Sequence, residues 1–137
     1  MENAVFTTDF EVRDYECDLQ GIVNNANYQH YLEHARHTFL QSCGIDFAHL
    51  TAKGILLIVT RIEIDYKYPL RSRDSFRVFL NLERLSRIRF AFNQEIVRLP
   101  DEKLIARARV FTASMNERGR PLLPPEIEHL LPDTNQT

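Results

Sequence analysis

Cysteine and net charge are both scarce in this chain, and each scarcity excludes a class of protein. Only two cysteines occur among 137 residues, Cys17 and Cys43. Two thiols at this separation form neither a disulfide framework nor a metal-ligand pattern, and reduced thiols suit a cytosolic protein. The 17 basic and 19 acidic side chains nearly cancel. No overall field therefore recruits nucleic acid or an anionic membrane, and we expect neither as a partner.

Long apolar runs, repeats and Gly/Ser-rich linkers are also missing. No stretch approaches the roughly 20 apolar residues that a membrane-spanning helix needs, so no span is expected. The first residues, MENAVFTTDFEVRDYE, carry acids where a signal peptide needs a basic start and an apolar run. We therefore expect an unprocessed cytoplasmic chain, with residues 1–137 forming a single domain.

One segment, residues 26–43, has the periodicity of an amphipathic helix. Its apolar stripe, at spacings of three and four, consists of Tyr28, Tyr31, Leu32, Ala35, Phe39 and Cys43. The polar side is predicted to consist of Gln29, His30, Glu33, His34, Arg36, His37 and Gln41. Either Asn24 or Asn25 can cap the start of this helix, because a side-chain amide oxygen accepts a bond from a first-turn N–H.

The remaining segments alternate with period two, which is typical of strands. A short strand is predicted over residues 5–12, and four longer ones follow the helix within residues 58–68, 76–82, 88–97 and 104–115. In the first of these four, one face is expected to hold Ile58, Thr60, Ile62, Ile64, Tyr66 and Tyr68. Short polar breaks favour antiparallel pairing. We predict an α+β domain whose sheet covers the helix and leaves enough apolar surface to require at least a dimer.

The segment from Asp18 to the helix start is the one that can carry chemistry. An acid and Gly21 lie in a loop that leads directly into a helix N-terminus, where unpaired N–H groups polarise a carbonyl oxygen. A carboxylate on the other side of that carbonyl carbon can activate water or attack directly. The segment is thus compatible with hydrolysis of an activated acyl group. It is equally compatible with an ordinary loop-to-helix junction in which Asp18 only makes a local turn.

The same segment resembles a known signature. Residues 18–28 read Asp-x-x-Gly-Ile-Val-Asn-Asn-x-x-Tyr and are followed by Tyr31, Glu33 and Ala35-Arg36. This pattern, with the later stretches 64–66 and 104–108, is similar to that of hotdog-fold thioesterases. The likeness is greatest to the branch that contains 4-hydroxybenzoyl-CoA thioesterase and the acyl-CoA thioesterases of the Tol-Pal cluster.

The resemblance implies a hotdog fold, in which an antiparallel five-stranded sheet wraps around one long central helix. It implies an acyl-CoA substrate, no cofactor, and a site at the interface of a homodimer or homotetramer. Asp18 would be the catalytic carboxylate, as nucleophile or general base. The backbone N–H of Asn25 would polarise the carbonyl, and Gly21 would let the loop approach the substrate closely.

Two departures from the family pattern keep other functions open. Many members of the Tol-Pal branch have a histidine at the position of Asn25, and plant-type acyl-carrier-protein thioesterases have one at the position of Ile22. Without either imidazole, the pattern favours a thioesterase with a single carboxylate and disfavours a dehydratase. The alternatives are an acyl-acyl-carrier-protein thioesterase and a non-catalytic acyl-CoA-binding hotdog protein.

Candidate substrate-binding residues are Tyr28, within the signature, and four arginines near predicted strand ends and turns. Arginine forks suit the phosphates of coenzyme A, although each is equally compatible with an ordinary surface residue. These arginines are Arg61, Arg71, Arg73 and Arg87. Three helix histidines share one face, but no fourth ligand accompanies them, and we predict no metal site. They are His30, His34 and His37.

Overall fold

A computed structural model describes residues 1 and 3–132, which form five strands and three helices. The strands are β1 (Phe6–Glu11), β2 (Ile55–Tyr66), β3 (Ser75–Arg84), β4 (Arg89–Leu99) and β5 (Lys103–Asn116). The helices are α1 (Asn25–Ser42), α2 (Phe47–Ala52) and α3 (Pro125–Glu128), and a 3-10 turn spans Asp14–Glu16. The predicted long helix and all five predicted strands are confirmed.

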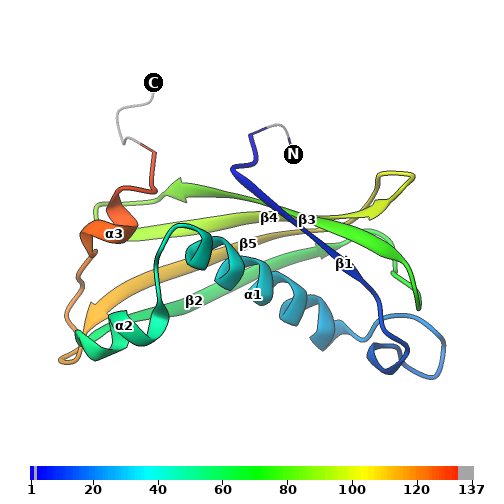
Figure 1. The fold of residues 1–137 in the computed structure, drawn as a ribbon, viewed down its shortest axis with the longest axis horizontal. Helices are drawn as coiled ribbons and strands as arrows, with labels where there is room; N and C mark the ends of the chain where they lie inside the picture. The colour runs from blue at the N-terminus through cyan, green and yellow to red at the C-terminus, as the bar shows by residue number, and fades with distance from the viewer. Residues whose placement is uncertain (2, 133–137) are drawn as a thin grey trace.

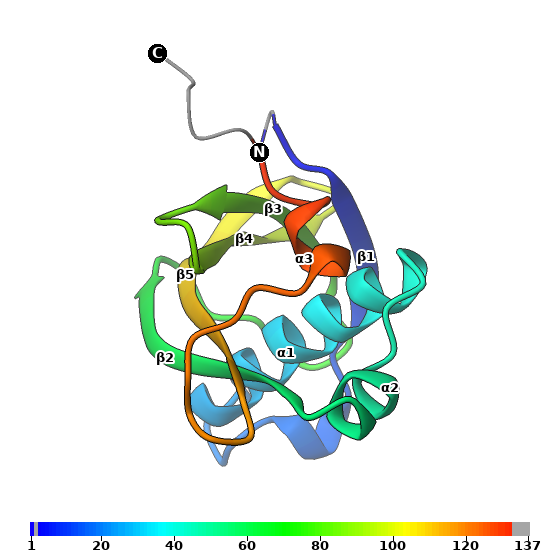
Figure 2. The same ribbon diagram turned by 90° about the vertical axis from the view of Figure 1, so that its left-hand side faces the viewer.

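All five strands belong to one antiparallel sheet with the order β1-β3-β4-β5-β2. Figure 1 shows α1 lying along the sheet, and the end-on view in Figure 2 shows the sheet curling around this helix. The predicted α+β fold, a five-stranded antiparallel sheet wrapped around one long helix, is therefore confirmed. Because the sheet curls, more of the helix surface is covered than a flat sheet would cover.

The apolar stripe of α1 is buried against the sheet in two successive clusters. Tyr28, Tyr31, Leu32 and Ala35 belong to the cluster nearer the helix start. Phe39 and Leu40 belong to the cluster at the other end, together with residues of β3 to β5. The helix begins as expected, because the Asn24 side chain accepts a hydrogen bond from the Ala26 N–H at 2.9 Å.

The face predicted for β2 is wrong over its first half. The pairing register with β5 shifts between Val59 and Arg61, which marks a β-bulge at Thr60. One extra residue inverts the alternation, so Val59, not Ile58, shares the helix-facing side with Ile62. Alternation alone cannot reveal such a bulge, because both phases of the strand are apolar over residues 55–59, before the bulge.

β2 is an edge strand that exposes large apolar side chains. Ile58 is 36% exposed and Val59 43% exposed, and they lie on opposite faces of the strand. An edge with apolar residues on both faces is a favourable surface for pairing with another chain.

Among the described helices, none has the length and apolar character that a membrane-spanning helix needs.

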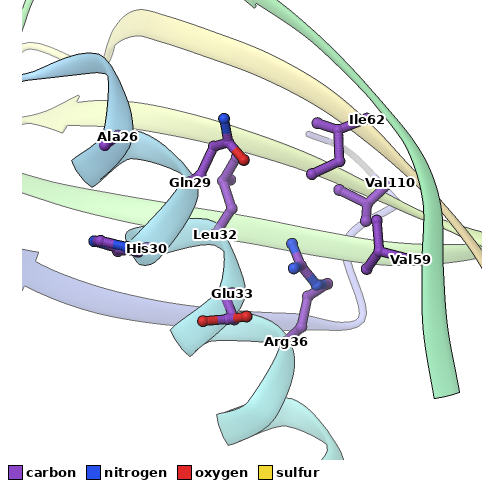
Figure 3. Close-up of a pocket in the computed structure, with 9 residues that line it drawn as sticks. All are labelled: Ala26, Gln29, His30, Leu32, Glu33, Arg36, Val59, Ile62 and Val110. Carbon is purple, nitrogen blue, oxygen red and sulfur yellow. The ribbon is translucent and has the colours of Figure 1, made fainter. Parts of the chain in front are cut away.

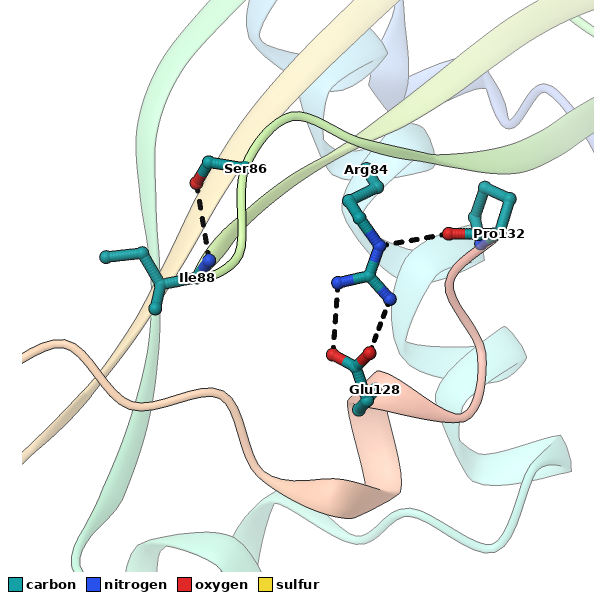
Figure 4. Close-up of polar contacts among 5 residues, drawn as sticks. All are labelled: Arg84, Ser86, Ile88, Glu128 and Pro132. Carbon is teal, nitrogen blue, oxygen red and sulfur yellow. Dashed lines mark hydrogen bonds and ion pairs between the residues drawn. The ribbon is translucent and has the colours of Figure 1, made fainter. Parts of the chain in front are cut away.

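The C-terminal segment closes the far end of the wrapped sheet. Arg84, at the end of β3, donates two hydrogen bonds to the Glu128 carboxylate, at 2.6 and 3.1 Å, and one to the Pro132 carbonyl (Figure 4). Ile127 and Leu131 pack into the second core cluster. The final helical turn of this segment is α3, at Pro125–Glu128.

Candidate functional site

Residues 16–24 form a small hairpin that leads directly into α1. The Asp18 N–H donates to the Ile22 carbonyl at 2.8 Å, and the Asn24 N–H donates to the Glu16 carbonyl at 3.1 Å. Cys17 and Val23 form an antiparallel β-bridge between these two hydrogen bonds. The hairpin therefore places Asp18 on the arm that lies beside the chain entering the helix.

The two carboxylate oxygens of Asp18 have different environments. Oδ1 accepts hydrogen bonds from the N–H groups of Gln20, at 2.8 Å, and Ile22, at 3.4 Å. No hydrogen-bond donor from the described residues reaches Oδ2, and the side chain is exposed. One oxygen thus fixes the carboxylate to the loop, while the other is able to contact water or a substrate.

Gly21 closes the tip of this hairpin. Its N–H donates to the Asp18 carbonyl at 3.0 Å, and its φ of +79° is one that side chains disfavour. A Cβ at this position would meet nothing within 4 Å. The turn conformation thus gives a reason for glycine here, and close approach to a substrate remains a prediction.

The start of α1 offers one free backbone donor. The Ala26 N–H is capped by the Asn24 side chain, and the Asn27 N–H bonds to the Asn24 carbonyl at 2.9 Å. Within residues 1 and 3–132, the Asn25 N–H has no hydrogen-bond acceptor. This donor lies at the positive end of the helix dipole, where it can stabilise a developing oxyanion.

Glu16 connects the hairpin to the helix, a role that the sequence did not indicate. Its Oε1 accepts hydrogen bonds from the Tyr31 hydroxyl and the Arg13 N–H, both at 2.8 Å. Its backbone carbonyl accepts from the Asn27 side chain at 2.8 Å. Burial, and secondarily the bond to Glu16, raise the pKa of Tyr31, so its hydroxyl remains a donor at neutral pH.

Tyr28 is placed in the core, where its hydroxyl has a structural partner. The side chain is 4% exposed, and its oxygen accepts a hydrogen bond from the Leu70 N–H at 2.9 Å. Leu70 in turn accepts from the Val23 N–H at 2.9 Å, so the ring helps to position the segment beside the hairpin. Burial raises the pKa of Tyr28. Contact between Tyr28 and a substrate remains a prediction.

The four predicted arginines divide into two groups. Arg71 pairs with Ile22 of the hairpin, and the Arg73 N–H bonds to the Val12 carbonyl at 2.9 Å, so both lie close to the Asp18 loop.

The other two are not brought to the loop within one chain. Arg61 lies on the sheet face away from α1 and forms an ion pair with Glu63 at 2.7 Å. Arg87 lies in the turn between β3 and β4. Figure 1 shows this turn at the end of the sheet away from the start of α1.

The three helix histidines have separate surroundings. His34 packs against Phe10, and His37 packs against Phe47. His30 lies 3.3 Å from the Asn27 side-chain oxygen. In the part of the chain that the structure describes, no group of three or more His, Cys, Asp or Glu side chains could hold a metal ion.

A cavity of about 380 Å³ lies between α1 and the strands β2 and β5 (Figure 3). It is lined by Ala26, Gln29, His30, Leu32, Glu33, Arg36, Val59, Ile62 and Val110. Arg36, predicted on the solvent side of the helix, is instead only 8% exposed. The curled sheet covers this side too, and Gln94, an inward-facing polar residue of β4, receives the guanidinium. In the sequence, a glutamine among the inward-facing apolar residues of β4 was the signal that could have indicated a buried polar partner.

The chain matches a protein family described as the thioesterase-like superfamily over residues 12–131. It is 35% identical to the Arabidopsis thaliana protein named acyl-acyl carrier protein thioesterase ATL3, chloroplastic, over 83% of this chain and 60% of that one. It is 31% identical to the Escherichia coli protein named long-chain acyl-CoA thioesterase FadM, over 75% of this chain and 77% of that one.

The fold is also close to solved structures. A crystal structure of a hypothetical protein from Aquifex aeolicus superposes with a TM-score of 0.84 at 33% identity, covering 93% of this chain and 99% of that one. The chain spans about 60% of the length of the two Arabidopsis relatives that it matches.

Proposed function

Because the chain belongs to the thioesterase-like superfamily, we propose that it hydrolyses acyl-CoA thioesters to a free acid and coenzyme A. The supporting observation is the unit formed by the hairpin and the start of α1. It holds an exposed carboxylate oxygen of Asp18 and an unbonded N–H of Asn25 on adjoining segments. A carboxylate can act as the general base and a free N–H as the oxyanion donor, and both accelerate hydrolysis of a thioester.

In the proposed reaction, the thioester carbonyl oxygen accepts a hydrogen bond from the Asn25 N–H. Asp18 removes a proton from a water molecule as the water oxygen bonds to the carbonyl carbon. The carbon–sulfur bond then breaks, and the departing thiolate takes up the proton. If Asp18 attacks directly instead, its carboxylate oxygen bonds to the carbonyl carbon and the carbon–sulfur bond breaks, which releases the coenzyme A thiolate and leaves a mixed anhydride. Water then hydrolyses the anhydride to the free acid and the Asp18 carboxylate, and the proton that this step releases goes to the thiolate.

Arg71 and Arg73 support coenzyme A as the carrier, because they lie beside the hairpin and their guanidinium groups suit phosphate oxygens. Arg61 and Arg87 join the site only if a second copy of the chain supplies them. We propose such a homodimer or homotetramer, with the exposed edge of β2 as the contact. Placement in the 4-hydroxybenzoyl-CoA and Tol-Pal branch is part of the same proposal.

Acyl carrier protein is the alternative carrier. The Arabidopsis relative is named for acyl-acyl-carrier-protein hydrolysis, and the Escherichia coli relative for long-chain acyl-CoA hydrolysis. Both are more than 30% identical to this chain. The two carriers share the phosphopantetheine arm, so the acyl site alone does not separate them.

The test is a thiol-release screen with purified protein. Short, long and aromatic acyl-CoAs are compared with the same acyl groups on acyl carrier protein. We expect release of free coenzyme A, with a higher kcat/KM for the CoA thioesters than for the carrier-protein thioesters. A reversed preference would select the alternative carrier. Binding of acyl-CoA without any thiol release would instead identify a non-catalytic binding protein.

A further inference from the structure

Arg36 is a buried cation without an ion-pair partner. Its guanidinium lies over the Phe92 ring, 5.9 Å from the ring centroid, and beside Gln94 of the same strand. No carboxylate among the described residues lies within 4.0 Å of it. Phe92 and Gln94 contact part of this charged group, and its remaining donors are available to an acceptor.

Only part of the guanidinium is satisfied by the protein. Nη1 donates to Gln94 Oε1 at 3.1 Å, and Gln94 Nε2 donates to the Leu32 carbonyl at 3.0 Å. Nε and Nη2 have no hydrogen-bond acceptor within the described chain. In the same residues, Ser114 Oγ is the one unbonded side-chain polar atom sealed from solvent, so these two nitrogens must be accessible.

The accessible donors face the cavity between α1 and β2. Figure 3 shows the Arg36 side chain reaching from the helix toward Val59 and Val110. The cavity begins at Ala26, in the first turn of α1 and next to the proposed carbonyl site. From Ala26 to Arg36 the helix axis advances about 15 Å, which an extended chain covers in about a dozen bonds.

The surroundings define which ligand group fits. Arginine has only donors, so the ligand must supply an acceptor. Glu33 is exposed and forms no ion pair with Arg36, but it lines the same cavity, and its negative charge disfavours a second carboxylate there. Val59, Ile62 and Val110 present apolar surface to the rest of the ligand. A neutral oxygen on an otherwise apolar chain meets these conditions.

We infer that the acyl group hydrolysed by this protein carries a ketone or hydroxyl oxygen remote from the thioester, and that Arg36 binds this oxygen. The inference rests on the proposed function for the identity of the ligand as an acyl thioester. It assigns to Arg36 a role in acyl-chain selectivity, distinct from the chemical step at Asp18.

The test measures binding, so that it does not depend on turnover. Non-hydrolysable CoA thioethers of about twelve chain carbons carry a ketone near the sulfur, in the middle, or near the far end. Plain thioethers of the same length serve as references. We expect at least one remote ketone to bind wild-type protein roughly tenfold more tightly than the plain chain, as hydrogen bonds to charged groups do. Equal affinity at every ketone position would overturn the inference.

Arg36→Met tests the assignment to this residue. The variant keeps an unbranched side chain without donors, and we expect it to bind ketone and plain chains equally. Arg77→Met is the matched control, because Arg77 pairs with Asp9 at 2.7 Å between β1 and β3, and not in the cavity. The Arg77→Met variant should bind ketone chains more tightly than plain chains, as the wild-type protein does. A preference that survives in Arg36→Met would overturn the assignment.

Two further readouts separate this inference from its alternatives. Thiol release from acyl-CoA reports on the proposed function, so hydrolysis without a ketone preference would overturn only the inference. A missing ketone preference, together with a loss of dimer in Arg36→Met, would show that the guanidinium serves the subunit contact instead. Thermal unfolding of each variant confirms that the folded state is being compared.

Discussion

At the scale of single residues, two buried tyrosine hydroxyls on α1 have opposite roles. Tyr28 accepts a hydrogen bond from the Leu70 N–H, whereas Tyr31 donates one to Glu16. Tyr28→Phe leaves a buried N–H without an acceptor, so the free energy of unfolding should fall by about 1–3 kcal/mol. Tyr31→Phe should cost only about 1 kcal/mol, because Glu16 keeps the Arg13 N–H. Urea unfolding measures both, and a larger loss for Tyr31→Phe would contradict this account.

Gly21 and Gly119 provide a matched pair of residues. Their φ angles are +79° and +77°, and a Cβ would meet nothing within 4 Å at either position. Alanine at each should therefore lower the stability by a similar amount, roughly 1–2 kcal/mol. Only Gly21→Ala should also lower kcat for thioester hydrolysis, because Gly21 shapes the Asp18 loop. Equal kcat values in the two variants would contradict a catalytic role for this loop.

Arg36 illustrates what residue types alone could not predict. Periodicity placed it on the polar, solvent-facing side of the helix, whereas in the structure it is 8% exposed and bonds to Gln94. A charged side chain is normally placed in solvent, and only the curl of the sheet makes this face internal. Gln94, a polar residue among inward-facing Phe90, Phe92 and Ile96, could have indicated that a buried partner exists.

At the scale of secondary-structure elements, alternation and helical periodicity predicted every strand and the long helix. The bulge in β2 was missed, because Ile58 and Val59 are both apolar and either phase satisfies the pattern. The hairpin at residues 16–24 was expected only as an irregular loop. A few backbone hydrogen bonds hold this hairpin together, and they leave no periodic signal in the sequence.

The attachment of α3 to β3 should depend on pH. Arg84 holds the pKa of Glu128 below its usual 4.5, so the ion pair stabilises the fold above that pH and is lost as the pH falls through the lowered value. Glu128→Gln should therefore have a lower Tm than wild type at pH 7, and the difference should narrow below about pH 4.5. Thermal unfolding across this range tests the claim, and a difference that widens in acid would contradict it.

At the scale of the whole molecule, the exposed edge of β2 predicts self-association. Ile58 lies on this edge and is 36% exposed. Ile58→Lys should shift the protein toward monomer, because charged residues on an edge strand oppose pairing. Light scattering after size-exclusion chromatography measures the mass of each species. A wild-type protein that is monomeric at micromolar concentration would rule out a site shared between subunits.

The sequence thus predicted the architecture and the position of the acid-bearing loop, because both depend on local pattern. The sequence did not predict which of the four arginines lie near the Asp18 loop. Arg71 and Arg73 come to the hairpin, whereas Arg87 lies at the other end of the sheet. Which arginines gather depends on strand length and topology, and in an oligomer on the second copy.

The most direct measurement of the central claim is the turnover of Asp18→Asn. Asparagine retains an oxygen for the N–H groups of Gln20 and Ile22 but cannot take up a proton or attack the thioester. Asp46→Asn is the matched control, since asparagine caps α2 as well as aspartate does. We predict that Asp18→Asn lowers kcat by at least roughly a hundredfold with CoA binding intact, and that Asp46→Asn keeps the parent rate. Thiol release by Asp18→Asn at the parent rate would contradict the account.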